Sequence, residues 1–271
     1  MPVPRTSLPE TKNVPLSQAL RRRDLVRYLV LRELKVRYRR SALGLMWTIL
    51  QPLLTMLVLK IVFSAIFRFE LPAGNYEIYA LSGILFWSFF SQSITSSMNS
   101  LRGNAGLLTK LPVPRSVFPL AVVLAGLVNL TIALFPLMVI VAFLGGRLTW
   151  ALLFLPISLF IAGVFTLGVG LILAPLAAFF HDLVEVVGVA LTLAMYMTPI
   201  FYPMSIVPDR YLWMVRYNPV RSVLEVFRDP FYLGKVPPVE HIFVAVVVSV
   251  ASLLIGSILF RHSSDRIALY V

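Results

Sequence analysis

The sequence has no cysteine and few residues that could carry a reaction. The absence of cysteine from the 271 residues excludes disulfides, thiolate catalysis and cysteine-based metal sites. The histidines His181, His241 and His262 are far apart in the sequence and form no H-E-x-x-H pair, so a metal-centred reaction is not predicted. No G-x-x-x-x-G-K-[ST] phosphate loop is present, so this chain cannot bind ATP in the P-loop manner.

Charge is also scarce, and this places the chain in a membrane. Charged residues make up 13% of the sequence, hydrophobic residues 59%, and the mean hydropathy is +0.87. Soluble domains carry far more charge, so we predict a polytopic membrane protein. Residues 1–44 are polar and basic, with no small-residue cleavage site after a short apolar segment. We therefore expect no signal peptide and a first apolar segment that stays as an anchor.

Six apolar runs are long enough to cross a bilayer. A helix rises about 1.5 Å per residue and the hydrocarbon core is about 30 Å thick, so a span needs about 20 residues. The runs are 45–67, 77–101, 117–144, 150–180, 185–204 and 241–260. The predicted fold class is therefore an all-α integral membrane protein with six transmembrane helices in residues 45–260, a basic segment 1–44 and a tail 261–271.

The distribution of Lys and Arg predicts the orientation. With both termini in the cytoplasm, the inner segments carry about 16 of these cations and the outer segments about seven. The net charge of +12 thus follows membrane topology, and we predict no nucleic-acid partner. Residues 16–44 mix apolar and basic residues at helical spacing, which is typical of a helix on the anionic inner surface of a membrane. A basic run that only sets topology is the alternative.

Polar residues within the first two spans fall at helical spacing. In the second span these residues share one face: Ser88, Gln92, Thr95, Ser96 and Asn99. The first span repeats the pattern with Gly44, Trp47, Thr48, Gln51 and Thr55. Polar groups facing lipid are costly, so each stripe predicts either helix packing or a hydrated path.

Aromatic residues accompany the polar stripe of the second span, at Phe86, Trp87, Phe89 and Phe90. Aromatic faces beside amides and hydroxyls suit the stacking of a sugar ring, although an interfacial aromatic belt explains the same residues. Tyr196 and Tyr202, at the fifth span, complete the predicted uncharged lining. Many weak contacts of this kind suit a long chain that must slide.

Prolines interrupt the region after the fifth span. Pro199, Pro203, Pro208, Pro219 and Pro230 forbid one continuous helix there. The apolar stretches 211–213 and 223–233 are too short to cross a membrane. We predict two short re-entrant or interfacial helices within an outer region of residues 205–240.

Several of these segments resemble a known family. The segments are Arg37-Tyr38-Arg39-Arg40-Ser41, Leu43-Gly44, Trp47, Gln51-Pro52, Pro199-Ile200-Phe201-Tyr202-Pro203, Asn218-Pro219, Glu225-x-Phe227-Arg228-Asp229 and Leu233-Gly234. Together with the spacing of the spans, they are similar to permease subunits of bacterial ABC exporters for polysaccharides, such as O-antigen, capsule and teichoic acid. The resemblance implies the ABC-2 type exporter fold and covers essentially the whole chain. His181 stands where many relatives have arginine.

The resemblance also implies partners and sites. It implies a homodimer in the bacterial inner membrane, two ABC ATPase subunits that hold ATP and Mg²⁺, no cofactor bound by this chain, and a lipid-linked polysaccharide as substrate. An inner loop of residues 102–116 would provide a coupling helix. The implied ATPase-facing residues are Arg37, Arg39, Arg40, Asn104, Leu108, Lys110, Pro112 and Arg115. The implied outer gate consists of Asn218, Pro219, Glu225, Phe227, Arg228 and Asp229.

Two alternatives stay open at this point. The same fold can export drugs or lipids. A membrane enzyme or a secondary carrier would need clustered catalytic groups or an acidic relay at mid-membrane, and the sequence has neither. Lys60 is the one cation well inside a predicted span, and we expect it to snorkel toward the outer surface.

Overall fold

The computed structural model describes residues 22–38, 44, 46–62, 75–110, 113–144, 149–180 and 182–267. Secondary structure in these ranges is helical, without a strand. The longer helices are α2 (Arg23–Tyr38), α3 (Met46–Leu59), α4 (Tyr76–Ser100), α6 (Val117–Phe143), α7 (Leu155–Phe179), α8 (Leu183–Met197), α10 (Pro219–Tyr232) and α11 (Val239–Ile267). The short ones are η2 (Arg102–Asn104), α5 (Ala105–Lys110), η3 (Trp150–Phe154), η4 (Met204–Ile206) and α9 (Asp209–Arg216). The predicted all-α class is confirmed.

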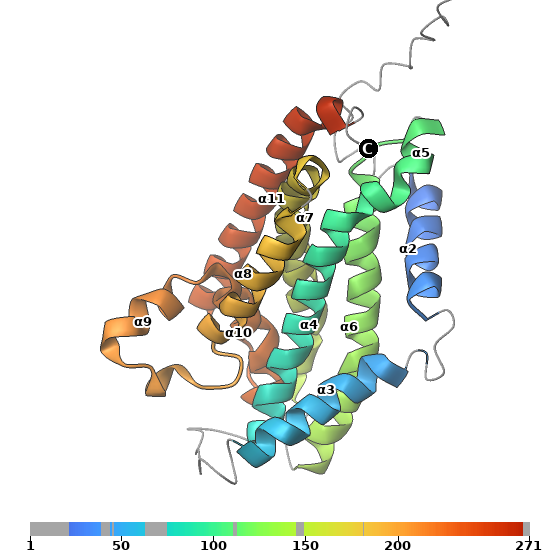
Figure 1. Ribbon diagram of the computed structural model, residues 1–271. Helices are drawn as coiled ribbons and strands as arrows, with labels where there is room; N and C mark the ends of the chain where they lie inside the picture. The colour runs from blue at the N-terminus through green and yellow to red at the C-terminus, as the bar shows by residue number, and fades with distance from the viewer. Residues whose placement is uncertain are drawn as a thin grey trace, which may run out of the picture.

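A bundle of α4, α6, α7 and α11 forms the centre of the molecule (Figure 1). The closest approach is between α7 and α11, where both helices carry glycine. A Cβ atom on Gly168 would lie 2.4 Å from the carbonyl carbon of Ser252, and one on Gly256 would lie 2.3 Å from the carbonyl oxygen of Gly168. Small residues allow such contact because membrane helices associate chiefly through packing and hydrogen bonds. Ser249 and Ser252 add hydrogen bonds across this interface to carbonyls of α7.

Helices occupy all six apolar runs that the sequence predicts as spans, but their lengths differ. Three helices in the described ranges are long and apolar enough to cross a membrane, namely Val117–Phe143, Trp150–Phe179 and Val239–Ser263. The apolar helices Met46–Val62 and Leu183–Met197 are shorter. α8 ends at Met197 because Thr198 is extended and Pro199 follows it, so the fifth helix is shorter than the predicted run 185–204. The count of six spans remains a prediction.

The remaining helices lie around this bundle. α2 packs beside α6 and buries Leu29 to 2% exposure (Figure 1). Two separate helices that are shorter than the bundle helices, α9 of eight residues and α10 of 14, follow α8, as the prolines predicted. α9 is largely exposed, whereas α10 contacts α4, α7 and α11 and buries most of its residues. The ammonium of Lys60 forms an ion pair with Glu77 at the start of α4, and its snorkelling toward the outer surface stays a prediction.

Candidate outer gate and transport path

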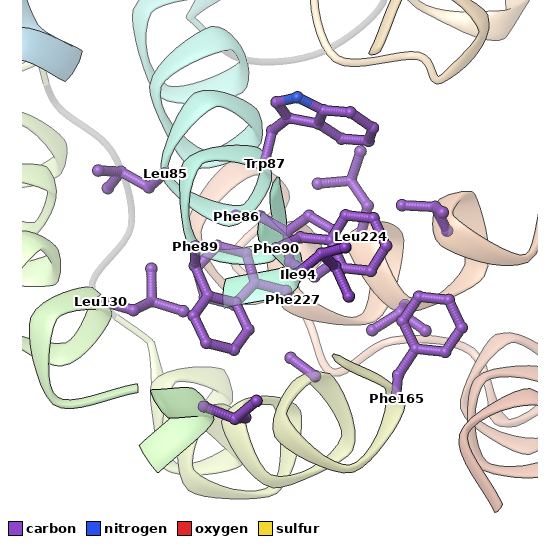
Figure 2. Close-up of a cluster of buried hydrophobic side chains, with 14 of the residues drawn as sticks. Leu85, Phe86, Trp87, Phe89, Phe90, Ile94, Leu130, Phe165, Leu224 and Phe227 are labelled. Atoms are coloured by element: carbon purple, nitrogen blue, oxygen red, sulfur yellow. The ribbon is translucent and has the colours of Figure 1, made fainter. Parts of the chain in front are cut away.

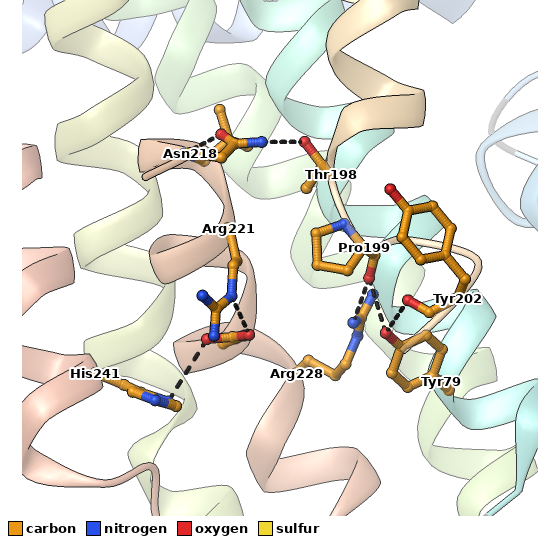
Figure 3. A network of polar contacts seen from close by, with 10 residues as sticks. Tyr79, Thr198, Pro199, Tyr202, Asn218, Arg221, Arg228 and His241 are labelled. Carbon is orange, nitrogen blue, oxygen red and sulfur yellow. Dashed lines mark hydrogen bonds and ion pairs between the residues drawn. The ribbon is translucent and has the colours of Figure 1, made fainter. Parts of the chain in front are cut away.

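Arg228 on α10 is buried, with 3% of its surface exposed, and its guanidinium contacts three neighbours, while its Nε has no hydrogen-bond partner among the described residues. Nη1 donates a hydrogen bond to the carbonyl of Pro199 at 2.8 Å (Figure 3). Nη2 donates one to the carbonyl of Ile200 at 3.2 Å. The guanidinium carbon lies 3.8 Å from the centroid of the Tyr79 ring, a cation–π contact. Arg228 thereby attaches α10 both to the turn after α8 and to α4.

Tyr79 holds the same turn from the other side. Its hydroxyl lies 2.9 Å from the carbonyl oxygen of Pro199 and 2.8 Å from that of Tyr202, and its single proton can be donated to either (Figure 3). Gly83, one helical turn further along α4, makes room for the guanidinium, because a Cβ there would lie 2.5 Å from Nη2 of Arg228. Neither Tyr79 nor Gly83 was predicted from the sequence. The feature of the sequence that could have indicated them is a tyrosine and a glycine one helical turn apart in the second predicted span.

Asn218 fixes the start of α10 and links it to the end of α8. Its side-chain oxygen accepts a hydrogen bond from the backbone N–H of Val220 at 3.0 Å, a helix N-cap, and Pro219 occupies the first helical position. Its side-chain nitrogen donates to the hydroxyl of Thr198 at 2.9 Å (Figure 3). The Asn-Pro pair of the predicted gate is thus a capping element with a tertiary hydrogen bond.

Charged residues surround the second half of α10. Arg221 and Glu225 form an ion pair at 2.6 Å, and Nδ1 of His241 lies 3.6 Å from the other oxygen of Glu225 (Figure 3). Burial of Asp229, together with the nearby Glu225 carboxylate, raises the pKa of Asp229 to about 6. No ion pair joins Arg228 to Asp229 within the described residues. Arg228 and Asp229, although adjacent in the gate motif, are therefore not each other's counter-ion.

The polar face of α4 borders two cavities. One, of about 250 Å³, lies between α3, α4 and α6, and its polar lining consists of Thr48, Gln51, Ser88, Gln92, Ser93 and Asn129. Trp47 also lines it. The second, of about 350 Å³, lies between α4 and α8 and is lined by Trp87, Ser91, Gln92, Thr95, Ser96, Gly188, Leu191, Thr192 and Met195. Four of the five residues of the predicted stripe thus border open space, with Gln92 bordering both cavities, whereas Asn99 lines neither.

Several polar groups of the stripe already have partners within α4. Thr95 donates to the carbonyl of Ser91 at 3.0 Å, and Asn99 donates to that of Thr95 at 3.0 Å. These hydrogen bonds run from a side chain to the backbone carbonyl four residues earlier, so the side-chain donors have partners inside an apolar helix. The side-chain oxygens of Thr95 and Asn99 can still accept hydrogen bonds. Of the two tyrosines, Tyr202 donates to the carbonyl of Tyr196 at 2.7 Å, and Tyr196 is 61% exposed.

The aromatic residues beside the stripe do not face these cavities as a group. Phe86 and Phe90 are 0% and 4% exposed, and Trp87 and Phe89 are also buried. Phe86 packs against Phe227 of α10, and Phe90 stacks on Phe165 of α7 (Figure 2). The prediction of a sugar-stacking surface is wrong for Phe86 and Phe90, because α10 and α7 cover them. Trp87 lines the cavity between α4 and α8, and Phe89 lines the cavity between α3, α4 and α6.

On the inner loop, Asn104 has a role within the chain. It is 6% exposed, donates to the carbonyl of Ser100 at 2.7 Å and accepts a hydrogen bond from Arg32 of α2. Asn104 therefore joins α2 to the segment before α5 rather than presenting its amide outward. Leu108 and Arg115 are half-buried. Arg39, Arg40, Pro112 and His181 lie outside the described residues, as do the side chains of Arg37 and Lys110.

Comparison with known proteins identifies the class. The profile of the ABC-2 type transporter family matches residues 24–232. The chain therefore belongs to the ABC-2 type transporter family, a class of multi-pass membrane permeases.

Individual relatives match nearly end to end. The chain is 34% identical over 249 residues to the O-antigen export system permease protein RfbA of Myxococcus xanthus, covering 91% of this chain and 95% of that protein. It is 32% identical to an RfbA of Klebsiella pneumoniae, covering 90% and 94%. It is 24% identical to the polysialic acid transport protein KpsM of Escherichia coli, covering 89% and 93%.

Proposed function

We propose that this chain is the membrane permease of an ATP-driven exporter that moves a lipid-linked polysaccharide of the O-antigen or capsule type across the bacterial inner membrane. The observation that carries the proposal is the similarity over nearly the whole length to O-antigen and capsule export permeases. These relatives favour a polysaccharide over a drug or a lipid as cargo. The uncharged, hydrogen-bonding cavities along α4 support it.

The proposed path follows the polar face of α4. A mostly neutral glycan exchanges hydrogen bonds easily with amides and hydroxyls, whereas a fixed charge would hold it at one place. Gln51 on α3, Gln92 on α4 and Asn129 on α6 bring three amides to one cavity. The lining thus comes from three helices and has little charge, which suits passage better than tight binding.

In the proposed assembly two copies of the chain work with two ABC ATPases. This chain binds no cofactor, and ATP and Mg²⁺ are held by the ATPases. Both termini and residues 102–116 are cytoplasmic, while residues 205–240 are external. Closure of the ATPases would move α5, and Asn104 with Arg32 would carry that movement to α2. On the other side, the network of Arg228 and Tyr79 would hold the outer gate closed.

Deletion of the gene tests this function. The expected result is loss of the polysaccharide from the cell surface with accumulation of lipid-linked polysaccharide inside, both restored by the wild-type chain. Unchanged surface polysaccharide would overturn the proposal. Cysteines introduced singly into this cysteine-free chain test the topology, because an impermeant reagent should label residue 209 from outside and should not label residue 110.

A further inference from the structure

An open groove of about 740 Å³ runs between α2 and α6, away from both cavities of α4. Its walls are mainly apolar, with Val26 and Val30 on α2, and Leu124, Leu127, Val128 and Ile132 on α6. Its volume lies within the range typical of small-molecule sites. Val128 is 40% exposed, so the groove is accessible from outside the protein.

Two arginines of α2 give the groove its charge. Arg23 and Arg27 line it, and both are exposed. They are four residues apart on one helical face, an arrangement of like charges that disfavours the helix unless an anion lies between them. Arg32, by contrast, has Glu33 and Asn104 as partners. The described residues supply no carboxylate within ion-pair distance of Arg23 or Arg27.

We propose that this groove binds an anionic phospholipid, with the phosphate between Arg23 and Arg27 and an acyl chain along the valines and leucines of α2 and α6. Charge complementarity selects this occupant. A membrane protein meets lipid on its outer faces, and basic residues beside apolar helix surfaces favour anionic headgroups on the inner leaflet. The exposed Asp24 is on α2 but does not line the groove, so it reduces the attraction without blocking it.

The site would fix α2 against α6 in the membrane. Besides the packing around Leu29, α2 is attached to the described bundle by the hydrogen bond of Arg32 to Asn104. A lipid that contacts both helices would add a second attachment. The inference is independent of the cargo, since the groove shares no residue with the proposed transport path.

Native mass spectrometry of the purified full-length chain tests the site. Phosphatidylglycerol and phosphatidylcholine with identical acyl chains are titrated in the same detergent. The wild type should bind phosphatidylglycerol with about 25-fold higher affinity than phosphatidylcholine, because each of the two arginines contributes about a factor of five. Arg23→Gln with Arg27→Gln should abolish this preference, whereas Arg23→Lys with Arg27→Lys should keep most of it.

Further variants separate the parts of the site. Val128→Trp places a bulky ring in the apolar wall and should lower the retention of both lipids. Arg210→Gln with Arg216→Gln removes two exposed arginines of α9 and should change nothing. Circular dichroism and a monodisperse elution profile confirm that each variant is folded.

Three outcomes would overturn the proposal. The first is an unchanged preference for phosphatidylglycerol in the Arg23→Gln, Arg27→Gln variant. The second is displacement of the lipid by glycerol phosphate at equal concentration, which would indicate an anion site without a lipid. The third is loss of ATPase binding in that variant with lipid retention intact, which would assign the two arginines to a protein interface.

Discussion

The guanidinium of Arg228 lies over the ring of Tyr79, 3.8 Å from the ring centroid, while both side chains donate hydrogen bonds toward the carbonyl of Pro199. One carbonyl between α8 and α10 is thus reached by donors from two different helices. A buried cation is costly when its donors lack acceptors, and Nε of Arg228 already has none among the described residues. Loss of the carbonyls of Pro199 and Ile200 would remove both hydrogen bonds of the guanidinium and leave its contact with the Tyr79 ring, so this turn stabilises the buried charge. The arrangement joins α4, α10 and the turn at 199–202 into one unit.

The two contacts of Tyr79 can be separated by substitution. Tyr79→Phe removes the hydroxyl and keeps the ring, and we expect it to lower the free energy of unfolding by about 1 kcal/mol. Tyr79→Leu also removes the cation–π contact and should lower it by about 1–2 kcal/mol more. Thermal unfolding in detergent measures both, with the exposed Tyr211→Phe on α9 as the control. Equal effects of Phe and Leu would show that the ring contributes nothing.

Substitution of Arg228 should open the proposed gate. Lysine keeps the charge but cannot donate in two fixed directions, so Arg228→Lys should weaken the hold on Pro199 and Ile200. We expect higher basal ATPase activity of the permease–ATPase complex and altered export. Arg216→Lys, an exposed change on α9, is the matched control. If Arg228→Lys left both export and basal ATPase activity unchanged, Arg228 would not hold the outer gate closed.

Asp229 gives the protein an unusual pH dependence. Its pKa is raised from 3.8 to about 6 by burial and by Glu225, so between these values the folded protein binds more protons than the unfolded chain. This group therefore stabilises the fold most below pH 4, and its contribution falls as pH rises through 4 to 6. Asp229→Asn should remove that fall and raise the free energy of unfolding at pH 7 by up to about 3 kcal/mol.

The melting temperature of Asp229→Asn, measured in detergent from pH 4.5 to 7.5, checks this effect. Asp209→Asn on α9 removes an exposed carboxylate and is the control. The difference between Asp229→Asn and the wild type should grow with pH. A constant difference over this range would contradict the raised pKa of Asp229.

Glycine packing between α7 and α11 predicts another stability difference. Gly168→Ala would place a methyl group 2.4 Å from the backbone of Ser252, where no side-chain movement can relieve the contact. We expect a loss of about 1–3 kcal/mol in unfolding free energy, as for other overpacked positions. A Cβ on Gly188 of α8 meets no atom within 4 Å, so Gly188→Ala should not lower stability and should raise it by up to about 1 kcal/mol through helix propensity. Equal melting temperatures of the two variants would contradict the tight crossing.

The sequence predicted the helices well because their signals are local. Apolar runs placed α6, α7 and α11, prolines separated α9 from α10, and the spacing of Ser88, Gln92 and Thr95 placed them on one face that borders cavities. Each of these features depends on residues within one helix or one turn. Periodicity is enough to find them.

What the sequence did not predict depends on contacts between distant segments. Phe86 is buried because α10 folds back against α4, and nothing in the second span indicates which helix will cover it. The partners of Arg228 are the backbone carbonyls of residues 199 and 200. Every residue has such a carbonyl, so the side chains of the motif do not indicate which carbonyls will accept from Arg228. The pairing of Lys60 with Glu77 likewise joins two helices across a loop.

The central claim is that a polysaccharide passes along the polar face of α4, and the most direct measurement is the surface polysaccharide of cells carrying Gln92→Leu with Asn99→Leu. Both residues are exposed, so the fold should be kept and membrane levels should match the wild type. Ser205→Leu, a polar-to-apolar change at an exposed position on η4 that lines neither cavity of α4 nor the groove between α2 and α6, is the control and should export normally. We predict that the double variant loses most surface polysaccharide while lipid-linked polysaccharide accumulates inside. Full export by the double variant would contradict the claim and assign the stripe to helix packing.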